Sequence, residues 1–322
     1  MNRIGRILRS GFDSQTNAFL RQAFLHPLVS VYRLLRILNQ DDEERERSIL
    51  RNLAMSLPDR DMGDYLQEVE NLKRSSCDEF AMFPYPYRDQ SPIPVEKGLD
   101  KERGLPYVVH KGRRFYGPCD QGVVETERSY RYFVEDEGLL GTGRRTQSPH
   151  AYVDGEFKVD CGDVVVDIGC SDALFAFDNA EQADRIYLFE AWKRWRPALE
   201  ASFAPFEDKT RIFTKLVSDK TSKNEIRLVD AIQEKESSHY FIKMDIEGSE
   251  RAVLASSSDF LRANKVKLSC CVYHRQDDDK VISGMLKDMG FSTRYSEGYM
   301  LPLCNGIHYP YFRHGVIYAR NY

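Results

Sequence analysis

The stretch "VVVDIGCSDALFAF", residues 164–177, joins an apolar run to a turn and then to a second apolar run. A short, nearly continuous apolar run is typical of a strand that is buried on both faces of a sheet. Gly169 follows it, and glycine allows close approach of a ligand or a backbone conformation that other residues avoid. The stretch therefore predicts a ligand-binding turn at the end of a parallel strand. The alternative is a β–α turn that holds no ligand.

Strand and helix patterns alternate from residue 157 to the end of the chain. Continuous apolar strands separated by helices predict an α/β fold whose parallel sheet is covered on both faces. The predicted strands are 163–169, 185–191, 211–218, 240–248, 267–274, 291–296 and 314–320. The predicted helices are 173–183, 195–206, 249–264 and 279–290.

The part of the chain before this pattern divides into two regions. Apolar spacing predicts an N-terminal helical region over residues 1–82, with Asp59 and Asp61 capping a helix over 62–74. We expect this region to serve oligomerisation, as in a homodimer, or docking on a larger assembly. Residues 83–156 then hold a proline-rich linker, a β-hairpin around Lys111 and Gly112, a helix over 127–140 and a loop on the substrate side.

Charge and cysteine content limit the partners of the protein. The net charge of −4 gives no basic excess, so nucleic acid is not an expected partner. Seven cysteines without a CxxC pair signal neither a disulfide framework nor a zinc site, which favours reduced thiols and a cytoplasmic location. Residues 1–40 hold six arginines and one acid. They could form a basic amphipathic helix in peripheral contact with a membrane, or a helix packed on its own protein.

The chemistry of the turn after the first strand argues against a dinucleotide. A pyrophosphate site would have three glycines as GxGxxG, whereas this turn has Gly169 alone and places the acidic Asp172 where phosphate would approach. A cofactor without phosphate and with a positive centre fits better, and S-adenosylmethionine is the obvious candidate. Glu190, at the tip of the next strand, is placed to accept hydrogen bonds from a ribose diol, although it could instead cap a helix.

A third acidic segment is "YFIKMDIEGSERAVL", residues 240–254. Alternation along the strand puts Lys243 and Asp245 on one side, and Glu247 and Glu250 follow within five residues. Acids gathered at a strand end are costly unless they bind a cation, a substrate hydroxyl or Lys243. Glu250 could also simply complement the dipole of the following helix.

Together, "VVVDIGCSD", "IYLFEA" and "FIKMDIEGSERAVL" resemble the FkbM-type methyltransferases. The similarity covers about residues 107–320, and "KMDIEGSE" is its most specific element. It implies a Rossmann-like, seven-strand class I methyltransferase sheet whose last strand is antiparallel, with the S-adenosylmethionine-dependent domain in residues 157–322. Members of this family often methylate hydroxyls of sugars or of polyketide-derived compounds.

The resemblance also assigns cofactor contacts to individual residues. It places Asp167, Gly169 and Ser171 around the methionine end, Glu190 on the ribose and Asp245 beside the transferred methyl. It places Ser218 and Asp219 at the adenine. The sequence departs from the usual glycines of this turn at Ser171 and Ala173, both of which are small residues.

Methyl transfer to a hydroxyl needs a group that removes the proton as the new bond forms. His274, at the end of the fifth strand, is the expected base, with Asp245 orienting it or acting as base itself; a purely structural histidine is the alternative. Asp245, Glu247 and His274 could also hold Mg²⁺ or Mn²⁺, which the sequence does not decide. The residues expected to contact the acceptor are Arg145, His150, Glu247, Tyr273 and His308. Arg145 and His150 would hold a phosphate or carboxylate group, and the loop around His308 would stack on a sugar ring; ordinary solvent-facing loops are the alternative.

The sequence thus predicts an S-adenosylmethionine-dependent O-methyltransferase that acts on a sugar or glycan precursor. A lipid or secondary-metabolite hydroxyl is the alternative acceptor. A non-catalytic binding protein on a degenerate methyltransferase fold is the alternative from another class. The joint presence of Asp167, Glu190 and Asp245 argues against that last alternative.

Overall fold

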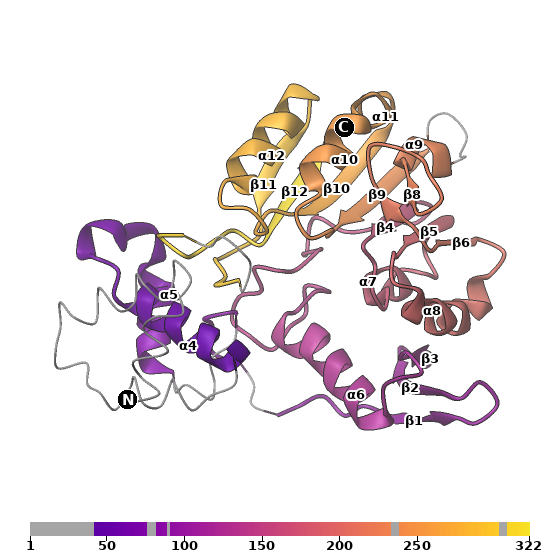
Figure 1. The fold of residues 1–322 in the computed structure, drawn as a ribbon, viewed down its shortest axis with the longest axis horizontal. Coiled ribbons are helices and arrows are strands. Elements are labelled where there is room, and N and C mark those ends of the chain that lie inside the picture. The colour runs from indigo at the N-terminus through magenta and orange to yellow at the C-terminus, as the bar shows by residue number, and fades with distance from the viewer. Residues whose placement is uncertain (1–41, 76–81, 89–90, 233–237, 303–307) are drawn as a thin grey trace, which may run out of the picture. The chain divides into compact units, whose positions relative to one another are not determined.

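The computed structural model describes residues 42–75, 82–88, 91–232, 238–302 and 308–322 (Figure 1). The chain divides into two compact units, residues 1–85 with 299–313 and residues 86–298 with 314–322. The predicted membrane contact of residues 1–40 lies outside the described residues. The oligomerisation or docking role of residues 1–82 stays a prediction.

The first unit is built on two helices, α4 (Asp42–Met55) and α5 (Leu66–Arg74). Both helices lie within the predicted helical region of residues 1–82. The cap prediction for Asp59 and Asp61 is wrong. These residues form a 3-10 turn of their own (Asp59–Asp61), a second turn follows at Gly63–Tyr65, and α5 therefore starts only at Leu66, without a side-chain cap.

The small core of the first unit includes a segment from much later in the chain. Leu50 and Ala54 of α4 and Val69 and Leu72 of α5 are buried together with Leu57, Leu301 and Phe312. The backbone N–H of Leu301 donates to the carbonyl of Met82, and the phenol of Tyr85 accepts from the N–H of Tyr299. Residues 299–302 and 308–313 thus contribute to this core, which local sequence patterns do not reveal.

The second unit begins with a three-stranded antiparallel sheet of β1 (Lys97–Asp100), β2 (Leu105–His110) and β3 (Arg113–Tyr116). The hairpin at Lys111 and Gly112 is confirmed, and both turn residues have positive φ, as two-residue hairpins favour. The strand β1 was not predicted. The predicted helix follows as α6 (Val123–Arg131), which continues as a π-helix (Tyr132–Asp136) before Gly138.

The main sheet has seven strands in the order β11-β12-β10-β9-β4-β5-β6. Its strands are β4 (Val164–Ile168), β5 (Arg185–Phe189), β6 (Thr210–Phe213), β9 (His239–Met244), β10 (Lys265–Cys271), β11 (Ser292–Tyr295) and β12 (Val316–Arg320). The first five of these strands are parallel, and β12 runs antiparallel between β10 and β11. The sequence prediction of this class I methyltransferase sheet, including its antiparallel last strand, is confirmed.

Helices cover both faces of the main sheet (Figure 1). The helices α10 (Glu250–Ser256), α11 (Ser258–Ala263) and α12 (Asp278–Asp288) pack through residues such as Leu254 and Leu286 on the face that holds Val166 and Ile242. The helices α7 (Leu174–Asp178) and α8 (Arg196–Ser202) cover the opposite face. A short helix, α9 (Leu228–Ala231), and a two-stranded sheet of β7 (Leu216–Val217) and β8 (Glu225–Ile226) lie between β6 and β9 in the chain.

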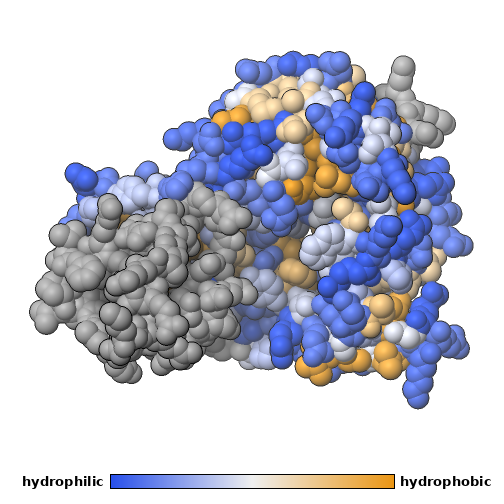
Figure 2. Space-filling view, viewed as in Figure 1, coloured by the Kyte–Doolittle hydropathy of each residue, from blue (hydrophilic) through white to orange (hydrophobic). Residues whose placement is uncertain are grey.

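The predicted helices 173–183 and 249–264 are shorter than the sequence suggested. The first ends at Asp178, and the second divides into α10 and α11 at Ser257. In the ranges that the structure describes, no helix is long and apolar enough to span a membrane. Hydrophilic residues cover most of the described surface in Figure 2, and hydrophobic residues show between them in small patches.

Candidate active site

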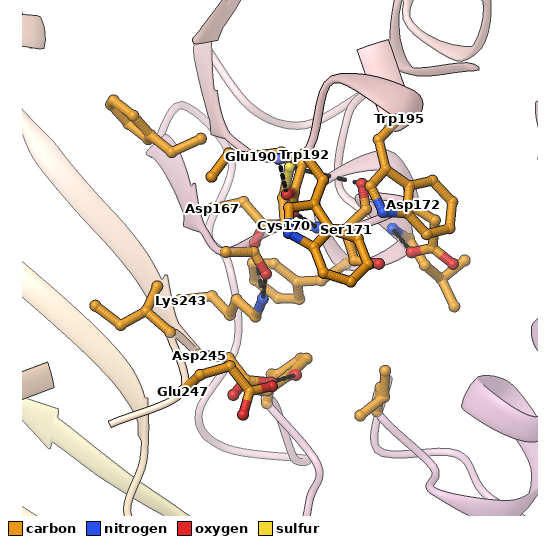
Figure 3. Close-up of a pocket in the computed structure, with 18 of the residues that line it drawn as sticks. Asp167, Cys170, Ser171, Asp172, Glu190, Trp192, Trp195, Lys243, Asp245 and Glu247 are labelled. Atoms are coloured by element: carbon orange, nitrogen blue, oxygen red, sulfur yellow. Dashed lines mark hydrogen bonds and ion pairs between the residues drawn. The ribbon is translucent and has the colours of Figure 1, made fainter. Parts of the chain in front are cut away.

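A cavity of about 500 Å³ lies at the carboxyl ends of β4, β5 and β9. The chain order of the sheet reverses between β4 and β9, and such a switch point is where ligands bind in open parallel sheets. The volume suits a small-molecule ligand. The polar and aromatic lining includes Glu137, His150, Tyr152, Asp167, Ser171, Asp172, Glu190, Trp192, Trp195, Lys215, Lys243, Asp245, Glu247 and Tyr273 (Figure 3).

The turn after β4 has an unusual backbone. Gly169, Ser171 and Ala173 have φ values of 71°, 51° and 62°, so every second residue is left-handed. A Cβ on Gly169 would lie 1.9 Å from the carbonyl oxygen of Asp245, which no side chain can tolerate. The glycine therefore lets the turn lie directly against the end of β9. Left-handed non-glycine residues store strain of the kind found at ligand sites.

A buried lysine holds this turn in place. The Lys243 ammonium lies 3.1 Å from a carboxylate oxygen of Asp167 and donates a hydrogen bond of 2.7 Å to the carbonyl of Gly169. Burial alone would lower the pKa of Lys243, but Asp167 and Asp245 outweigh burial and hold this pKa above its ordinary value. Asp167 lines the cavity as predicted, but its carboxylate is paired with Lys243. Its contact with a cofactor stays a prediction.

Glu190 connects two loops at the tip of β5. One oxygen accepts a hydrogen bond of 2.9 Å from the N–H of Ser171, and the other accepts one of 2.6 Å from the N–H of Trp192. The carboxylate lines the cavity, as its predicted ribose contact requires. The alternative of a helix cap does not apply, because α8 begins only at Arg196.

Two tryptophans at the rim of the cavity were not predicted as site residues. Trp192 is 68% exposed although it lies beside Glu190, and Trp195 lines the same end of the cavity near Asp172 (Figure 3). The sequence signal that could have identified them is the pair of tryptophans within five residues of the strand-end Glu190, in "FEAWKRW".

Five of the predicted site residues are not part of the cavity lining, namely Ser218, Asp219, Arg145, His274 and His308. Ser218 and Asp219 lie beyond residues 215–217, which form the lining on that side. Arg145 is buried, and its guanidinium lies 3.3 Å from Asp136; its contact with an acceptor group stays a prediction. His274 is also buried, and its Nε2 atom lies 3.4 Å from Asp245 and 3.6 Å from Glu247. His308 belongs to the first unit, and its contact with an acceptor stays a prediction.

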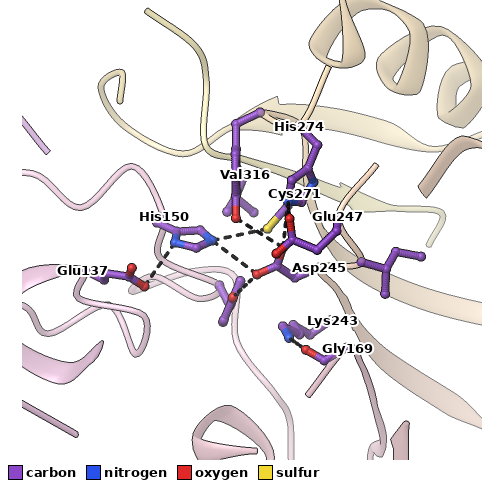
Figure 4. Close-up of polar contacts among 12 residues, drawn as sticks. Glu137, His150, Gly169, Lys243, Asp245, Glu247, Cys271, His274 and Val316 are labelled. Atoms are coloured by element: carbon purple, nitrogen blue, oxygen red, sulfur yellow. Dashed lines mark hydrogen bonds and ion pairs between the residues drawn. The ribbon is translucent and has the colours of Figure 1, made fainter. Parts of the chain in front are cut away.

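Asp245 is the centre of a polar cluster at the end of β9 (Figure 4). The phenol of Tyr152 donates to Oδ2 at 2.8 Å, and that of Tyr273 donates to Oδ1 at 3.4 Å. The Nε2 atoms of His150 and His274 lie 3.6 and 3.4 Å from Oδ2 and Oδ1, respectively. Burial would raise the pKa of Asp245, but His150, Lys243 and His274 outweigh it and hold this pKa well below its usual range. The carboxylate is therefore a fixed negative charge.

Each of the two histidines has a second carboxylate on its other nitrogen. The Nδ1 atom of His150 lies 3.2 Å from Glu137, and that of His274 lies 2.9 Å from Glu250. Burial lowers the pKa of His150, but Glu137 and Asp245 outweigh burial and raise it to about 9. The pKa of His274 is also raised, because Glu250 and Asp245 outweigh the effect of burial.

The structure brings the predicted metal ligands together at His274, whose Nε2 atom lies 3.4 Å from Oδ1 of Asp245 and 3.6 Å from Oε2 of Glu247. In the part of the chain that the structure describes, Asp245 and His274 group with Glu250, and Asp245 also groups with His150 and Cys271. Glu247 is in neither group. Its side chain is 91% exposed at the cavity mouth, on a left-handed backbone with φ 55°. The histidines of both groups are held in ion pairs, and we assign no metal to them.

Glu137, Tyr152 and Asp172 line the cavity but were not predicted as ligand contacts. Glu137 carried no signal, because it lies in the charged run "EDE" within the predicted helix 127–140, far in sequence from the acids at the strand ends. Tyr152 stands in "SPHAY", next to the predicted His150. Burial raises the pKa of Asp172 to about 7, and its carboxylate accepts a hydrogen bond from the N–H of Leu174 in the turn.

Residues 179–293 match the family model described as the methyltransferase FkbM domain. This segment is similar to the FkbM methyltransferase family. It includes Glu190, Asp245 and His274, whereas the turn at Gly169 lies just before it. The resemblance predicted from the sequence is confirmed.

Three of the similar solved structures are described as methyltransferases. The methyltransferase FkbM of Methylobacillus flagellatus KT shares 20% identity with a TM-score of 0.40, and the match covers 51% of this chain and 45% of that one. A precorrin-6y C5,15-methyltransferase of Geobacter metallireducens GS-15 has 12% identity, a TM-score of 0.34 and coverage of 52% and 83%. A putative methyltransferase of Streptococcus mutans in complex with SAH has 12% identity, a TM-score of 0.35 and coverage of 51% and 91%. These similarities are too low to transfer a ligand or an activity to the FkbM domain. No curated protein matches the chain.

The contact between Gly169 and Asp245 predicts a stability effect. Gly169→Ala should lower the free energy of unfolding by about 2 kcal/mol or more, because a left-handed alanine is strained and its Cβ meets a backbone carbonyl. Urea unfolding followed by circular dichroism measures this change. Gly155→Ala is the matched control, since its Cβ would have no atom within 4 Å. Equal stability of the two variants would contradict the contact.

Removal of the Lys243 ammonium predicts a second, pH-dependent effect. Lys243→Met leaves the buried Asp167 carboxylate unpaired and should cost about 3–5 kcal/mol of unfolding free energy at neutral pH. Burial raises the pKa of Asp167 in the folded state, so folding favours the protonated carboxyl. The loss of unfolding free energy in Lys243→Met should therefore become smaller as pH falls. Urea unfolding of both proteins between about pH 5 and pH 8, where proteins are usually most stable, measures how this loss depends on pH. A deficit that is constant with pH would contradict it.

Proposed function

We propose that the protein is an S-adenosylmethionine-dependent O-methyltransferase that methylates a hydroxyl of an uncharged sugar or glycan. One observation carries the proposal: the single-glycine turn and the ionised Asp245 touch each other at one cavity, located at the switch point of a class I methyltransferase sheet. The match to the FkbM domain model supports the reaction class.

The cavity lining fits S-adenosylmethionine better than a nucleotide phosphate. The carboxylates of the lining are those of Glu137, Asp167, Asp172, Glu190, Asp245 and Glu247. Fewer cationic groups face them, namely Lys215, Lys243 and His150. This excess of acid favours a ligand with a positive centre and disfavours phosphate. When bound, S-adenosylmethionine would supply a methyl group on a positively charged sulfur, with Glu190 at the ribose and the turn at 169–171 around the methionine end.

The other end of the cavity supplies groups that bind hydroxyls. The phenols of Tyr152 and Tyr273, the carboxylates of Asp245 and Glu247 and the imidazole of His150 gather there. An anionic acceptor is disfavoured, because Lys243 is paired with Asp167 and the predicted Arg145 is paired with Asp136 outside the lining. The acceptor is therefore proposed to be an uncharged polyhydroxy compound.

Cofactor binding is tested by titration calorimetry with S-adenosylmethionine. The wild-type protein should bind, and Glu190→Gln should weaken binding by about 1–3 kcal/mol, because the variant loses charge-assisted bonds to the diol. Glu102→Gln is the matched control, on an exposed residue away from the cavity. Failure of the wild-type protein to bind millimolar cofactor would favour the degenerate-fold alternative. An unchanged affinity in Glu190→Gln would contradict only the ribose contact.

The acceptor is tested by mass spectrometry after incubation with S-adenosylmethionine. The panel pairs neutral monosaccharides and methyl glycosides with their phosphates, and adds a sugar nucleotide and a lipid with a free hydroxyl. A mass gain of one methyl on neutral members is expected, because the acceptor end of the cavity is acidic. Preferential methylation of the phosphates would contradict an uncharged acceptor, and methylation of the lipid alone would contradict the sugar class.

A further inference from the structure

We propose that His150, rather than His274, takes the proton from the acceptor hydroxyl, and that Glu137 is the residue that positions His150 for this step. The inference rests on the proposed function, because it assigns a base to the same methyl transfer. Neither assignment follows from the family match, since both His150 and Glu137 lie outside residues 179–293.

The first argument is the location of the two histidines. His150 lines the cavity together with Tyr152, Asp245 and Tyr273. His274 is not part of the lining, and its ring lies between Asp245 and the buried Glu250. A base must come within hydrogen-bond reach of the hydroxyl that it deprotonates, and of the two rings only that of His150 is part of the cavity lining.

The second argument is the way in which the imidazole of His150 is held. Its Nδ1 atom lies 3.2 Å from Oε2 of Glu137, a carboxylate that is only 7% exposed. A carboxylate on Nδ1 fixes the tautomer and the ring orientation and directs Nε2 away from itself. Nε2 then lies at the end of the ring that faces Asp245, 3.6 Å from Oδ2 (Figure 4). This is the orientation that a proton acceptor at the cavity needs.

The backbone before Glu137 explains how that carboxylate reaches the cavity. The helix α6 widens into the π-helix Tyr132–Asp136, and π-helical turns often occur at functional sites. Phe133 within this turn and Glu137 directly after it both line the cavity. The backbone N–H of Glu137 donates to the carbonyl of Tyr132, which fixes the position of the side chain.

The third argument is the charge around His150. The titratable groups that face its ring are Glu137, Asp245, Cys271, Tyr152 and Tyr273. Lys243 lies farther away, over the ring of Tyr152. The two carboxylates raise the pKa of His150 to about 9, so the protein without cofactor holds mostly the imidazolium at neutral pH. A sulfonium in the same cavity would lower this pKa, because like charges disfavour the protonated ring. Binding of S-adenosylmethionine thus favours the neutral imidazole of His150, which is the form that can accept a proton.

The proposed step balances in atoms and charge. The O–H bond of the acceptor breaks, and its proton goes to Nε2 of the neutral His150. The acceptor oxygen forms a bond to the methyl carbon as the carbon–sulfur bond breaks, and the electron pair of that bond stays on sulfur. The resulting imidazolium lies between the carboxylates of Glu137 and Asp245, which stabilise it.

Histidine NMR tests the positioning role without any acceptor. In the ¹³C- and ¹⁵N-histidine-labelled full-length protein, the signal of His150 is assigned with His150→Gln. We expect this signal to titrate near pH 9, to titrate at lower pH with S-adenosylmethionine and to shift less with the neutral S-adenosylhomocysteine. Glu137→Gln should lower the pKa of His150 and leave that of His274 in place, whereas Glu250→Gln should do the reverse. A His150 signal that is unchanged by Glu137→Gln would overturn the positioning role.

Kinetics with an acceptor from the panel tests the base. The rate should rise with pH toward the pKa of His150, and His150→Gln should lose at least about a hundred-fold in kcat and lose this pH dependence. Glu137→Gln should shift the profile to lower pH, and Glu137→Asp should restore part of the wild-type profile. The control is His110→Gln, which removes another buried, carboxylate-paired histidine outside the cavity and should keep the wild-type rate.

A wild-type pH profile in His150→Gln, or loss of the pH dependence in His274→Gln instead, would overturn the assignment of the base. Calorimetry separates this result from failure of the proposed function. If His150→Gln still binds S-adenosylmethionine with wild-type affinity, a loss of rate belongs to the base. If the wild-type protein does not bind the cofactor, the proposed function fails, and the NMR result on Glu137 still stands by itself.

Discussion

The contact between the turn after β4 and the end of β9 is the constraint on which the rest of the site depends. Gly169 lies so close to the carbonyl of Asp245 that no side chain fits between them. Lys243 strengthens this contact, because one ammonium group pairs with Asp167 on β4 and donates to the carbonyl of Gly169. The carboxyl ends of the neighbouring parallel strands β4 and β9 are thus held together, and this pair of strand ends is called the platform below. Residues that follow both strands line the cavity.

Charge is distributed on this platform in a way that suits methyl transfer. Asp245 stays ionised because two imidazoles and Lys243 surround it. Each imidazole is in turn held by a buried glutamate, so the cluster alternates negative and positive groups instead of concentrating one sign. A buried network of charges is stable only when every charged group has a partner of opposite sign, and the alternation provides these partners. Asp245 and His150 are the members of this network that line the cavity, where the positively charged methyl donor is proposed to bind.

Local patterns predicted the sheet well and the N-terminal half less well. The strands β4, β5, β9 and β10 are short and mostly apolar because both faces of the sheet are covered, and this composition marks them as buried strands. The cap at Asp59 failed because two tight turns intervene before Leu66. The strand β1 was missed because it follows a proline-rich segment, and only its pairing with β2 makes it a strand.

The sequence by itself determined the fold class, the glycine turn and the acids at the strand ends, because these depend on residue type and spacing along one strand and its turn. Only the tertiary structure decided that Arg145 is used in an ion pair, that His274 pairs with both Asp245 and Glu250, and that Glu137 meets His150. Glu137 and Asp245 are far apart in the chain, and no periodicity relates them. Their meeting at one imidazole follows from how the π-helix and the sheet pack, which is a property of the folded chain and not of any local pattern.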